Sequence, residues 1–329
     1  MTHLTYLEAA VVGLVQGVTE MFPVSSLGHS VLIPAIIGGS WARDLNVASA
    51  ESPYLAFVVG LHVATAIALI IYFWRDWVRI VGGFFSSIAR REVKTPDQKL
   101  AWMIVLATIP VGLVGLVFEH EFRVIFGVPW RAALFLILNG LILFAGERFR
   151  TRKSKQADEQ VQREREEEPA LVGAARVGGA HSSGQRALRQ QEIATAVQAD
   201  RRITSFSYVQ AVLIGSAQIL ALLAGISRDG VTMVAGMFRG LSREDAARFA
   251  FLLATPVILA AGVLKIPDLL GPLGNGVRPQ ILAGSIVSGI AAYLSVRFLM
   301  KYFQTRTLTP FAIYCLVFGV ASFVYLTVK

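Results

Sequence analysis

Charged residues and cysteine are both scarce in this chain of 329 residues. Charged side chains make up 16% of it and hydrophobic ones 54%, whereas soluble domains average roughly 25% charged residues. The shortage of charge excludes an ordinary soluble domain and indicates an all-α polytopic membrane protein. The single cysteine, Cys315, excludes a disulfide within the chain. Residues 1–8 lack the basic region of a cleavable signal peptide, so we expect none.

Acidic residues are outnumbered by basic ones, 22 to 31, which gives a net charge of +9. A basic excess can indicate nucleic-acid binding, but in a membrane protein it gathers in cytoplasmic loops. We therefore expect the lipid bilayer to be a partner of this chain, and no nucleic acid.

Two apolar stretches, 4–39 and 207–238, are broken into pieces that are each shorter than the roughly 20 residues of a membrane span. We interpret both as re-entrant helical hairpins. Longer apolar segments predict six transmembrane helices, at 54–74, 100–118, 130–145, 249–264, 281–299 and 310–326. Basic loops at 75–99 and 239–248 indicate that the first span runs inward and the fourth outward. The two halves then have opposite orientation, which predicts an inverted-topology repeat.

The chain accordingly divides into a first membrane repeat at 1–147, a charged segment at 148–203 and a second membrane repeat at 204–329. Glu, Arg and Gln dominate the charged segment, which has little apolar surface to bury. We interpret it as a flexible, solvated cytoplasmic linker. A regulatory docking segment is the alternative.

The first break, in the stretch GLVQGVTEMFPVSSLGHS, concentrates polar side chains in apolar surroundings. Gln16 and Glu20 are four residues apart, so they share one face of a helix that Pro23 ends. The next polar residues are two hydroxyls suited to cap a following helix and an imidazole one turn into it: Ser25, Ser26 and His29. A carboxylate, two hydroxyls and a histidine thus meet at one break.

The second break, in the stretch GSAQILALLAGISRDGVT, matches the first when the chain is shifted by 202 positions. The shift superposes Gly13 on Gly215, Gln16 on Gln218, Ser25 on Ser227 and Gly28 on Gly230. Paired broken helices of this kind are typical of binding sites in membrane proteins built from repeats. Chance similarity between two Gly- and Ser-rich apolar segments is the alternative.

Ionisable residues within a membrane are functional-site hypotheses, because burying them is costly unless they are paired or wet. Helices that begin after the two breaks would direct free N–H groups at the centre of the membrane, which suits an anion. Arg228 adds a planar donor fork that matches phosphate. The alternative is a structural ion pair of Arg228 with Asp229 or Glu20. His62, within a span, we interpret as a satisfied interhelical residue.

The two stretches resemble the signatures of the bacterial undecaprenyl-diphosphate phosphatases, integral membrane enzymes of the bacitracin-resistance type. The first signature, QGVTE at 16–20 followed by PVSSLGH at 23–29, is complete. The second, AGISRDGVT at 224–232, departs from the family pattern at Ala224, where the family has proline, and at Asp229, where it has serine. The resemblance covers 1–147 and 204–329, and the linker has no usual counterpart.

The resemblance implies hydrolysis of undecaprenyl diphosphate, a long-chain polyprenyl lipid, to the monophosphate lipid carrier and inorganic phosphate. The carrier would be recycled for peptidoglycan synthesis in cell wall biogenesis. The site would open to the outer face of the bacterial inner membrane. The family fold is described as an inverted repeat with two re-entrant hairpins, which hydropathy and loop charges also predict here.

By motif position, Ser26 is the expected nucleophile and His29 its proton-transfer partner. Gln16 and Glu20 would hold a divalent cation, Mg²⁺ or Ca²⁺. Arg228 is expected to bind the diphosphate together with the small and hydroxyl residues of both motifs, namely Ser25, Gly28, Gly225, Ser227, Gly230 and Thr232. In an alternative, Glu20 activates water and Ser26 only binds phosphate.

Asp229 could pair with Arg228 or supply another oxygen ligand to the cation. Neutralising an arginine inside an anion site would weaken its hold on the diphosphate. We therefore favour Asp229 as a metal ligand.

Two rival functions were weighed against this hydrolase. The acid-phosphatase-like lipid phosphatases need a second histidine after their Ser-Arg element, and no histidine follows His181, so we reject them. A lipid flippase or anion transporter could use the same site without cleaving the substrate. The sequence leaves a homodimer open.

Overall fold

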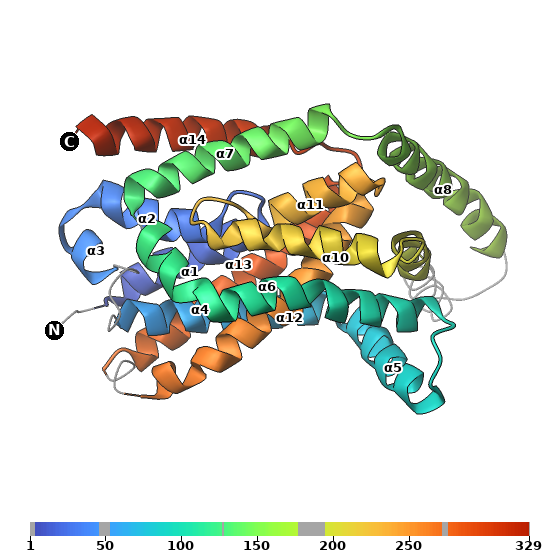
Figure 1. The fold of residues 1–329 in the computed structure, drawn as a ribbon, viewed down its shortest axis with the longest axis horizontal. Coiled ribbons are helices and arrows are strands. Elements are labelled where there is room, and N and C mark those ends of the chain that lie inside the picture. Colours follow the sequence, from blue (N-terminus) through green and yellow to red (C-terminus); the bar gives the residue numbers. More distant parts are fainter. Residues whose placement is uncertain (1–3, 46–52, 127, 177–194, 272–275, 329) are drawn as a thin grey trace.

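Helices form every regular element in the part of the chain that the computed structural model describes, residues 4–45, 53–126, 128–176, 195–271 and 276–328 (Figure 1). The all-helical fold predicted from the sequence is confirmed. The first half contains α1 (Tyr6–Met21), α2 (Ser26–Ile37), α3 (Gly39–Asp44), α4 (Pro53–Tyr72), α5 (Trp74–Arg90), α6 (Pro96–Phe126) and α7 (Pro129–Arg148). The linker contributes α8 (Arg152–Arg176) and a helix at Thr195–Ile203. The second half contains α10 (Tyr208–Ser216), the 3₁₀ helix η1 (Ala217–Leu222), α11 (Arg228–Arg239), α12 (Arg243–Leu270), α13 (Arg278–Tyr302) and α14 (Thr309–Val328).

Within the described ranges, five helices are long and apolar enough to cross a membrane: Pro96–Phe118 in α6, Arg243–Leu264 in α12, and the whole of α7, α13 and α14. Two bent helix pairs raise the number to seven if each pair is one span. Gly60–Tyr72 meets α5 at 87°, and Thr195–Ile203 meets Tyr208–Leu222 at 92°. The expected number of spans, six, lies between these two counts. The chain is a multi-pass membrane protein.

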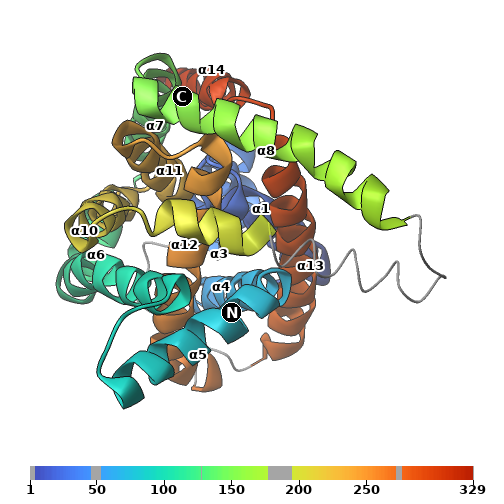
Figure 2. The same cartoon turned by 90° about the vertical axis from the view of Figure 1, so that its right-hand side faces the viewer.

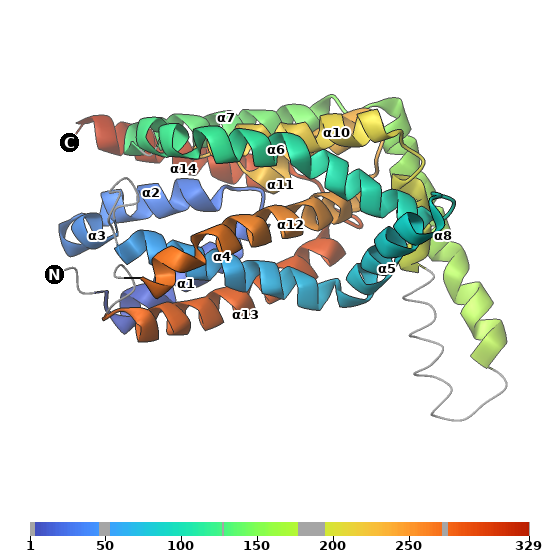
Figure 3. The same cartoon turned by 60° about the horizontal axis from the view of Figure 1, so that its bottom comes forward.

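The two broken stretches extend toward opposite ends of the molecule (Figures 1 and 3). α2 leads away from its break toward α3, whereas α11 leads away from its break toward α8. α3 and the C-terminal end of α14 lie at one end, and α5 and α8 lie at the other (Figure 1). This arrangement accords with two halves of opposite orientation, although the repeat and the re-entry of the hairpins into a membrane stay predictions.

The helices that lead into the two breaks begin with the same local signal. Thr5 accepts a hydrogen bond from the Glu8 N–H at 3.2 Å, and the Glu8 carboxylate accepts one from the Thr5 N–H at 2.8 Å. Ser207 and Gln210 make the same reciprocal pair at the start of α10, at 3.3 and 3.0 Å. Each capping box satisfies two N–H groups that the first helical turn leaves free, and so fixes where the helix starts.

Two glycines at matching positions of the halves allow close helix crossings. A Cβ built on Gly13 of α1 would lie 2.3 Å from the Gly284 carbonyl oxygen of α13. A Cβ built on Gly215 of α10 would lie 2.2 Å from the Ala107 carbonyl oxygen of α6. Membrane helices associate through such small-residue contacts because lipid supplies no hydrophobic drive for helix pairing. These crossings fix α1 and α10, and hence both breaks, against long helices.

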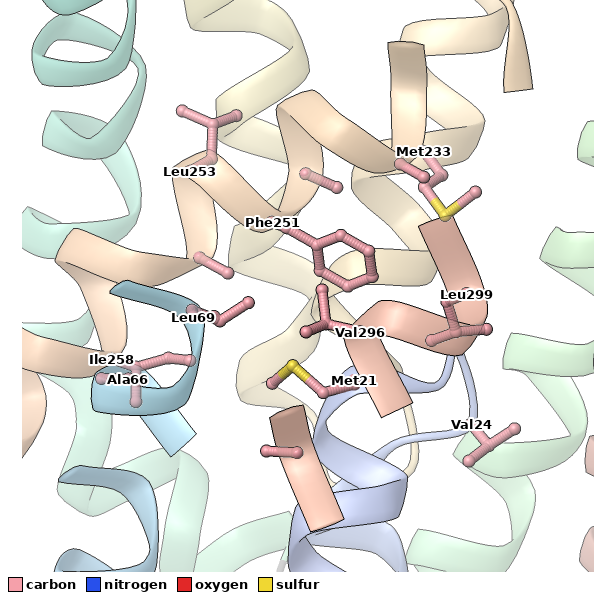
Figure 4. Close-up of a cluster of buried hydrophobic side chains, with 14 of the residues drawn as sticks. Met21, Val24, Ala66, Leu69, Met233, Phe251, Leu253, Ile258, Val296 and Leu299 are labelled. Atoms are coloured by element: carbon pink, nitrogen blue, oxygen red, sulfur yellow. The ribbon is translucent and has the colours of Figure 1, made fainter. Parts of the chain in front are cut away.

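A cluster of buried apolar side chains supports the first break (Figure 4). Met21, the last residue of α1, lies beside Val296 of α13 and Phe251 of α12. Leu69 of α4 and Met233 of α11 belong to the same buried core. Side chains from four other helices therefore hold the end of α1 in place.

The linker differs from the solvated spacer expected from its composition, because both of its ends pack on the membrane helices. Figure 2 shows α8 lying across one end of the molecule. The Ser154 hydroxyl is buried and donates to the Leu241 carbonyl at 2.7 Å, and Thr151 donates to the Met237 carbonyl at 3.3 Å. A few apolar side chains, among them the fully buried Ile203, and several charged ones add further contacts, so a low apolar content did not prevent docking. Residues 177–194 lie outside the described ranges.

Asp200 is the centre of a buried ion network at the linker's second end. Its carboxylate is fully buried and lies 2.7 Å from the Arg79 guanidinium of α5 and 2.9 Å from that of Arg248 in α12. Asp76 of α5 also pairs with both arginines, at 2.6 and 3.0 Å. Asp200 therefore joins the linker to two membrane helices.

We expect Asp200→Ala to destabilise the protein by about 3 kcal/mol, because it leaves buried arginine charge short of a partner. The measurement is the thermal unfolding midpoint of the purified protein in detergent. Glu159→Ala is the matched control, since the Glu159–Arg163 pair at 3.8 Å is exposed and should contribute less than about 1 kcal/mol. Equal midpoints for the two variants would contradict a structural role for the network.

Candidate active site

The two chain breaks lie directly against each other. The Gly225 N–H donates to the Ser25 hydroxyl oxygen at 3.2 Å. A Cβ built on Gly28 would lie 2.9 Å from the Gly225 Cα, and Gly225 has φ of 115°, a conformation that favours glycine. The glycines of the two motifs thus allow the breaks to touch.

A serine caps the helix that follows each break. Ser25 accepts a hydrogen bond from the Gly28 N–H at the start of α2, and Ser227 accepts one from the Gly230 N–H at the start of α11, both at 3.2 Å. Ser25 has φ of 69°, a strained value for a residue other than glycine, and such strain clusters at functional sites. The buried Thr232 hydroxyl donates to the carbonyl four residues before it at 2.7 Å. In this state all three hydroxyls are engaged by the backbone.

Glu20 is the centre of the polar contacts between the two halves. One of its carboxylate oxygens lies 2.8 Å from the Arg228 guanidinium, which forms the ion pair named above as the structural alternative. The other accepts hydrogen bonds from the Gln16 amide, at 2.9 Å, and from the Ser26 hydroxyl. Glu20 is only 7% exposed. The Ser26 hydroxyl, the Glu20 carboxylate that can accept its proton, and the Arg228 guanidinium are therefore in contact in a poorly solvated environment.

Asp229 has one carboxylate oxygen 3.5 Å from the Arg228 guanidinium, a long contact. Its other oxygen is buried and has no hydrogen-bond partner among the residues that the structure describes. In the same ranges, no group of three or more His, Cys, Asp or Glu side chains could hold a metal ion. Mg²⁺, however, usually binds one or two carboxylates together with water and substrate phosphates. Glu20 and Asp229 fit a cation that the substrate helps to hold, with Gln16 beside them.

His29 makes no hydrogen bond with Ser26, the residue expected to be its partner. Its Nδ1 lies 2.7 Å from the Ser25 carbonyl oxygen, and its Nε2 lies 2.7 Å from the Tyr314 hydroxyl of α14. Both ring nitrogens are thus engaged, and the Ser26 hydroxyl bonds to Glu20. The expected direct Ser26–His29 pair is absent because each group has found another partner.

Two residues of this site were not assigned to it from the sequence. His62 of α4 has its Nε2 3.4 Å from the Gln16 amide nitrogen and 3.7 Å from the Glu20 carboxylate. We interpreted it as interhelical, although its position within a span was the signal of a functional site. Asn139 of α7 donates to the Pro23 carbonyl and accepts from the Ser227 N–H, both at 3.0 Å. Asn139 thus bridges the two breaks, and the signal in the sequence was an amide side chain within an apolar span.

The chain is similar to known proteins over nearly its whole length. The family model described as bacitracin resistance protein BacA matches residues 9–321. An undecaprenyl-diphosphatase of Mycolicibacterium paratuberculosis is 58% identical over 327 residues, which cover 99% of each chain. Undecaprenyl-diphosphatase 2 of Frankia alni is 54% identical over 97% of each chain. Undecaprenyl-diphosphatase 2 of Chromobacterium violaceum is 37% identical over 97% of this chain and 98% of its own.

Proposed function

Because the chain belongs to the bacitracin resistance protein BacA family, we propose that it hydrolyses undecaprenyl diphosphate to undecaprenyl phosphate and inorganic phosphate. The observation that carries this proposal is the Ser26 hydroxyl bonded to Glu20, which is itself paired with Arg228. Phosphoryl transfer needs a positioned nucleophile and a cation close to the charge that develops. The product would return to peptidoglycan synthesis as a lipid carrier.

In the first step, the Ser26 oxygen attacks the terminal phosphorus and its proton passes to Glu20. The bond from that phosphorus to the bridging oxygen breaks, and undecaprenyl phosphate leaves as an anion. Negative charge thereby moves from the Glu20 carboxylate to the former bridging oxygen of the departing undecaprenyl phosphate. Arg228 then loses its charged partner and is free to stabilise the phosphoryl group through its donor fork. The N–H groups at the starts of α2 and α11 favour the same anion.

Gln16 and Asp229, with Glu20 while it is ionised, would hold a divalent cation, Mg²⁺ or Ca²⁺, together with the substrate. The cation would neutralise diphosphate charge. The unpartnered oxygen of Asp229 supports its role as a ligand. Oxygen-rich sites suit these two hard cations.

Asp229→Ser is expected to leave an active enzyme that needs a higher metal concentration, because it removes one oxygen ligand. The measurement is a titration of activity against Mg²⁺ and against Ca²⁺ for both proteins. An unchanged metal optimum with tighter substrate binding would instead assign Asp229 to the Arg228 pair.

The site is proposed to open to the outer face of the bacterial inner membrane. The basic residues of 75–99 and 239–248 support this orientation, because such loops stay in the cytoplasm. α5 and α8, at the end of the molecule that carries these loops, would then be cytoplasmic (Figure 1).

Phosphate release tests both the activity and its sidedness. Purified protein with undecaprenyl diphosphate should release inorganic phosphate and undecaprenyl phosphate in equal amounts. Right-side-out membrane vesicles should hydrolyse substrate added outside, whereas inverted vesicles should require permeabilisation. Binding of the lipid by purified protein without phosphate release would favour a flippase or transporter, and activity confined to intact inverted vesicles would reverse the orientation.

A further inference from the structure

His29 is too deeply buried to exchange a proton with water by itself. It is 2% exposed, and its ring lies against those of Tyr314 and Phe318 of α14, with centroid separations of 5.7 and 5.2 Å and interplanar angles of 7° and 14°. Tyr314, by contrast, is 43% exposed. Of the two residues that bond to the ring nitrogens, Tyr314 is the less buried, since Ser25 is 4% exposed.

The hydrogen bonds of His29 fix its tautomer. A carbonyl oxygen can only accept, so Nδ1 must donate its proton to the Ser25 carbonyl, 2.7 Å away. Nε2 of the neutral ring is then an acceptor, and the Tyr314 hydroxyl, also 2.7 Å away, must donate to it. The basic lone pair of His29 is thus occupied by the Tyr314 proton.

Tyr314 lies at the level of the first break. The neighbouring Cys315 has its sulfur 3.9 Å from the Pro23 carbonyl oxygen and 3.3 Å from the Asn139 amide that joins the two breaks. α14 also packs on α2, the helix that carries Ser26 and His29. A tyrosine hydroxyl that donates to one atom can accept from another, so it can pass a proton along.

We propose that Tyr314 relays a proton between the reacting water and His29 in the second half of the reaction. This inference rests on the proposed function, in which Ser26 carries the phosphoryl group after the first step. Water gives a proton to the Tyr314 oxygen as Tyr314 gives its own proton to Nε2 of His29. The hydroxide oxygen bonds to phosphorus, the bond from phosphorus to Ser26 breaks, and Ser26 recovers the proton held by Glu20. Inorganic phosphate leaves, and His29 later returns its proton to solvent through Tyr314.

Tyr314→Phe tests the relay because it removes the hydroxyl and keeps the stacked ring. We expect turnover to fall at least about a hundredfold, since an acid–base group contributes on that scale, and KM to fall with it, because formation of the phosphoenzyme is not slowed. The phosphorylated enzyme should accumulate, because only its hydrolysis is slowed. For the wild-type enzyme, a single-turnover chase experiment isolates hydrolysis of the phosphoenzyme. The rate of that step should depend on the deuterium content of the solvent along a curve, which indicates that two protons move.

The matched control is Tyr325→Phe on the same helix, whose hydroxyl makes a 3.4 Å contact with the Ile36 carbonyl and should be dispensable for turnover. Wild-type turnover in Tyr314→Phe would overturn the relay and show that the hydroxyl merely covers Nε2. Slow turnover without accumulated phosphoenzyme would also overturn it. A wild-type protein that releases no phosphate would refute the proposed function itself, which is a different result.

Discussion

Replacing Arg228 with alanine is expected to lower turnover at least about a hundredfold, the usual scale for losing a group that stabilises transition-state charge. Arg228 is held near the proposed nucleophile, since its guanidinium contacts the carboxylate that binds the Ser26 hydroxyl. Arg228→Lys should recover only part of the loss, because a point charge cannot reproduce the planar fork. The measurement is the initial rate of phosphate release from undecaprenyl diphosphate.

Folding must be separated from catalysis in this experiment, because Arg228→Ala leaves Glu20 buried without its cation. Thermal unfolding in detergent reports stability, and Arg228→Lys keeps a charge in place. Arg239→Ala is the control, since Arg239 is exposed in the last turn of the same helix. A stable Arg228→Ala variant with nearly normal turnover would eliminate the proposed diphosphate clamp.

Ser26→Ala is expected to reduce turnover by at least about a hundredfold and to abolish the phosphorylated enzyme, because it removes the proposed nucleophile. The fold should be little affected, since Glu20 keeps its bonds to Gln16 and Arg228. Rapid quenching with radiolabelled substrate would detect the phosphoserine in the wild type and its absence in the variant.

Ser25→Ala provides the contrast one residue away. It removes the cap of α2 and the hydrogen bond to Gly225, so it should cost about 1 kcal/mol of stability. Phosphoserine should still form, with a higher KM, because Ser25 is expected to bind the diphosphate and not to attack it. If Ser26→Ala kept more than about a tenth of wild-type turnover, the alternative in which Glu20 activates water would replace the covalent route.

Much of the fold could be predicted because a bilayer limits what a chain can do. Long apolar runs predict helices, and charge within such runs predicts function. Glu20 and Arg228 stood out for this reason, and the structure brings them into contact. The motifs also predicted breaks at Pro23 and Gly225, because proline and glycine act locally.

Contacts between side chains that are distant in the sequence could not be predicted. The donor on Nε2 of His29 lies 285 residues away, and nothing near Tyr314 in the sequence indicates this pair. The docking of the linker depends on Asp200 meeting Arg79 and Arg248, which no periodicity reveals. The expectation that the linker has no usual counterpart also fails for close relatives, because the alignment with the Mycolicibacterium paratuberculosis protein covers 99% of both chains.

The helix α11 connects the candidate active site to the linker. Its first residue, Arg228, contacts the Glu20 carboxylate, and its last turn receives the hydrogen bond from Thr151 at the start of α8. Twelve residues of helix span about 18 Å. We expect a displacement of the first turn of α8 to move Arg228 through this helix. One helix thus connects the linker to the arginine that we propose binds the diphosphate.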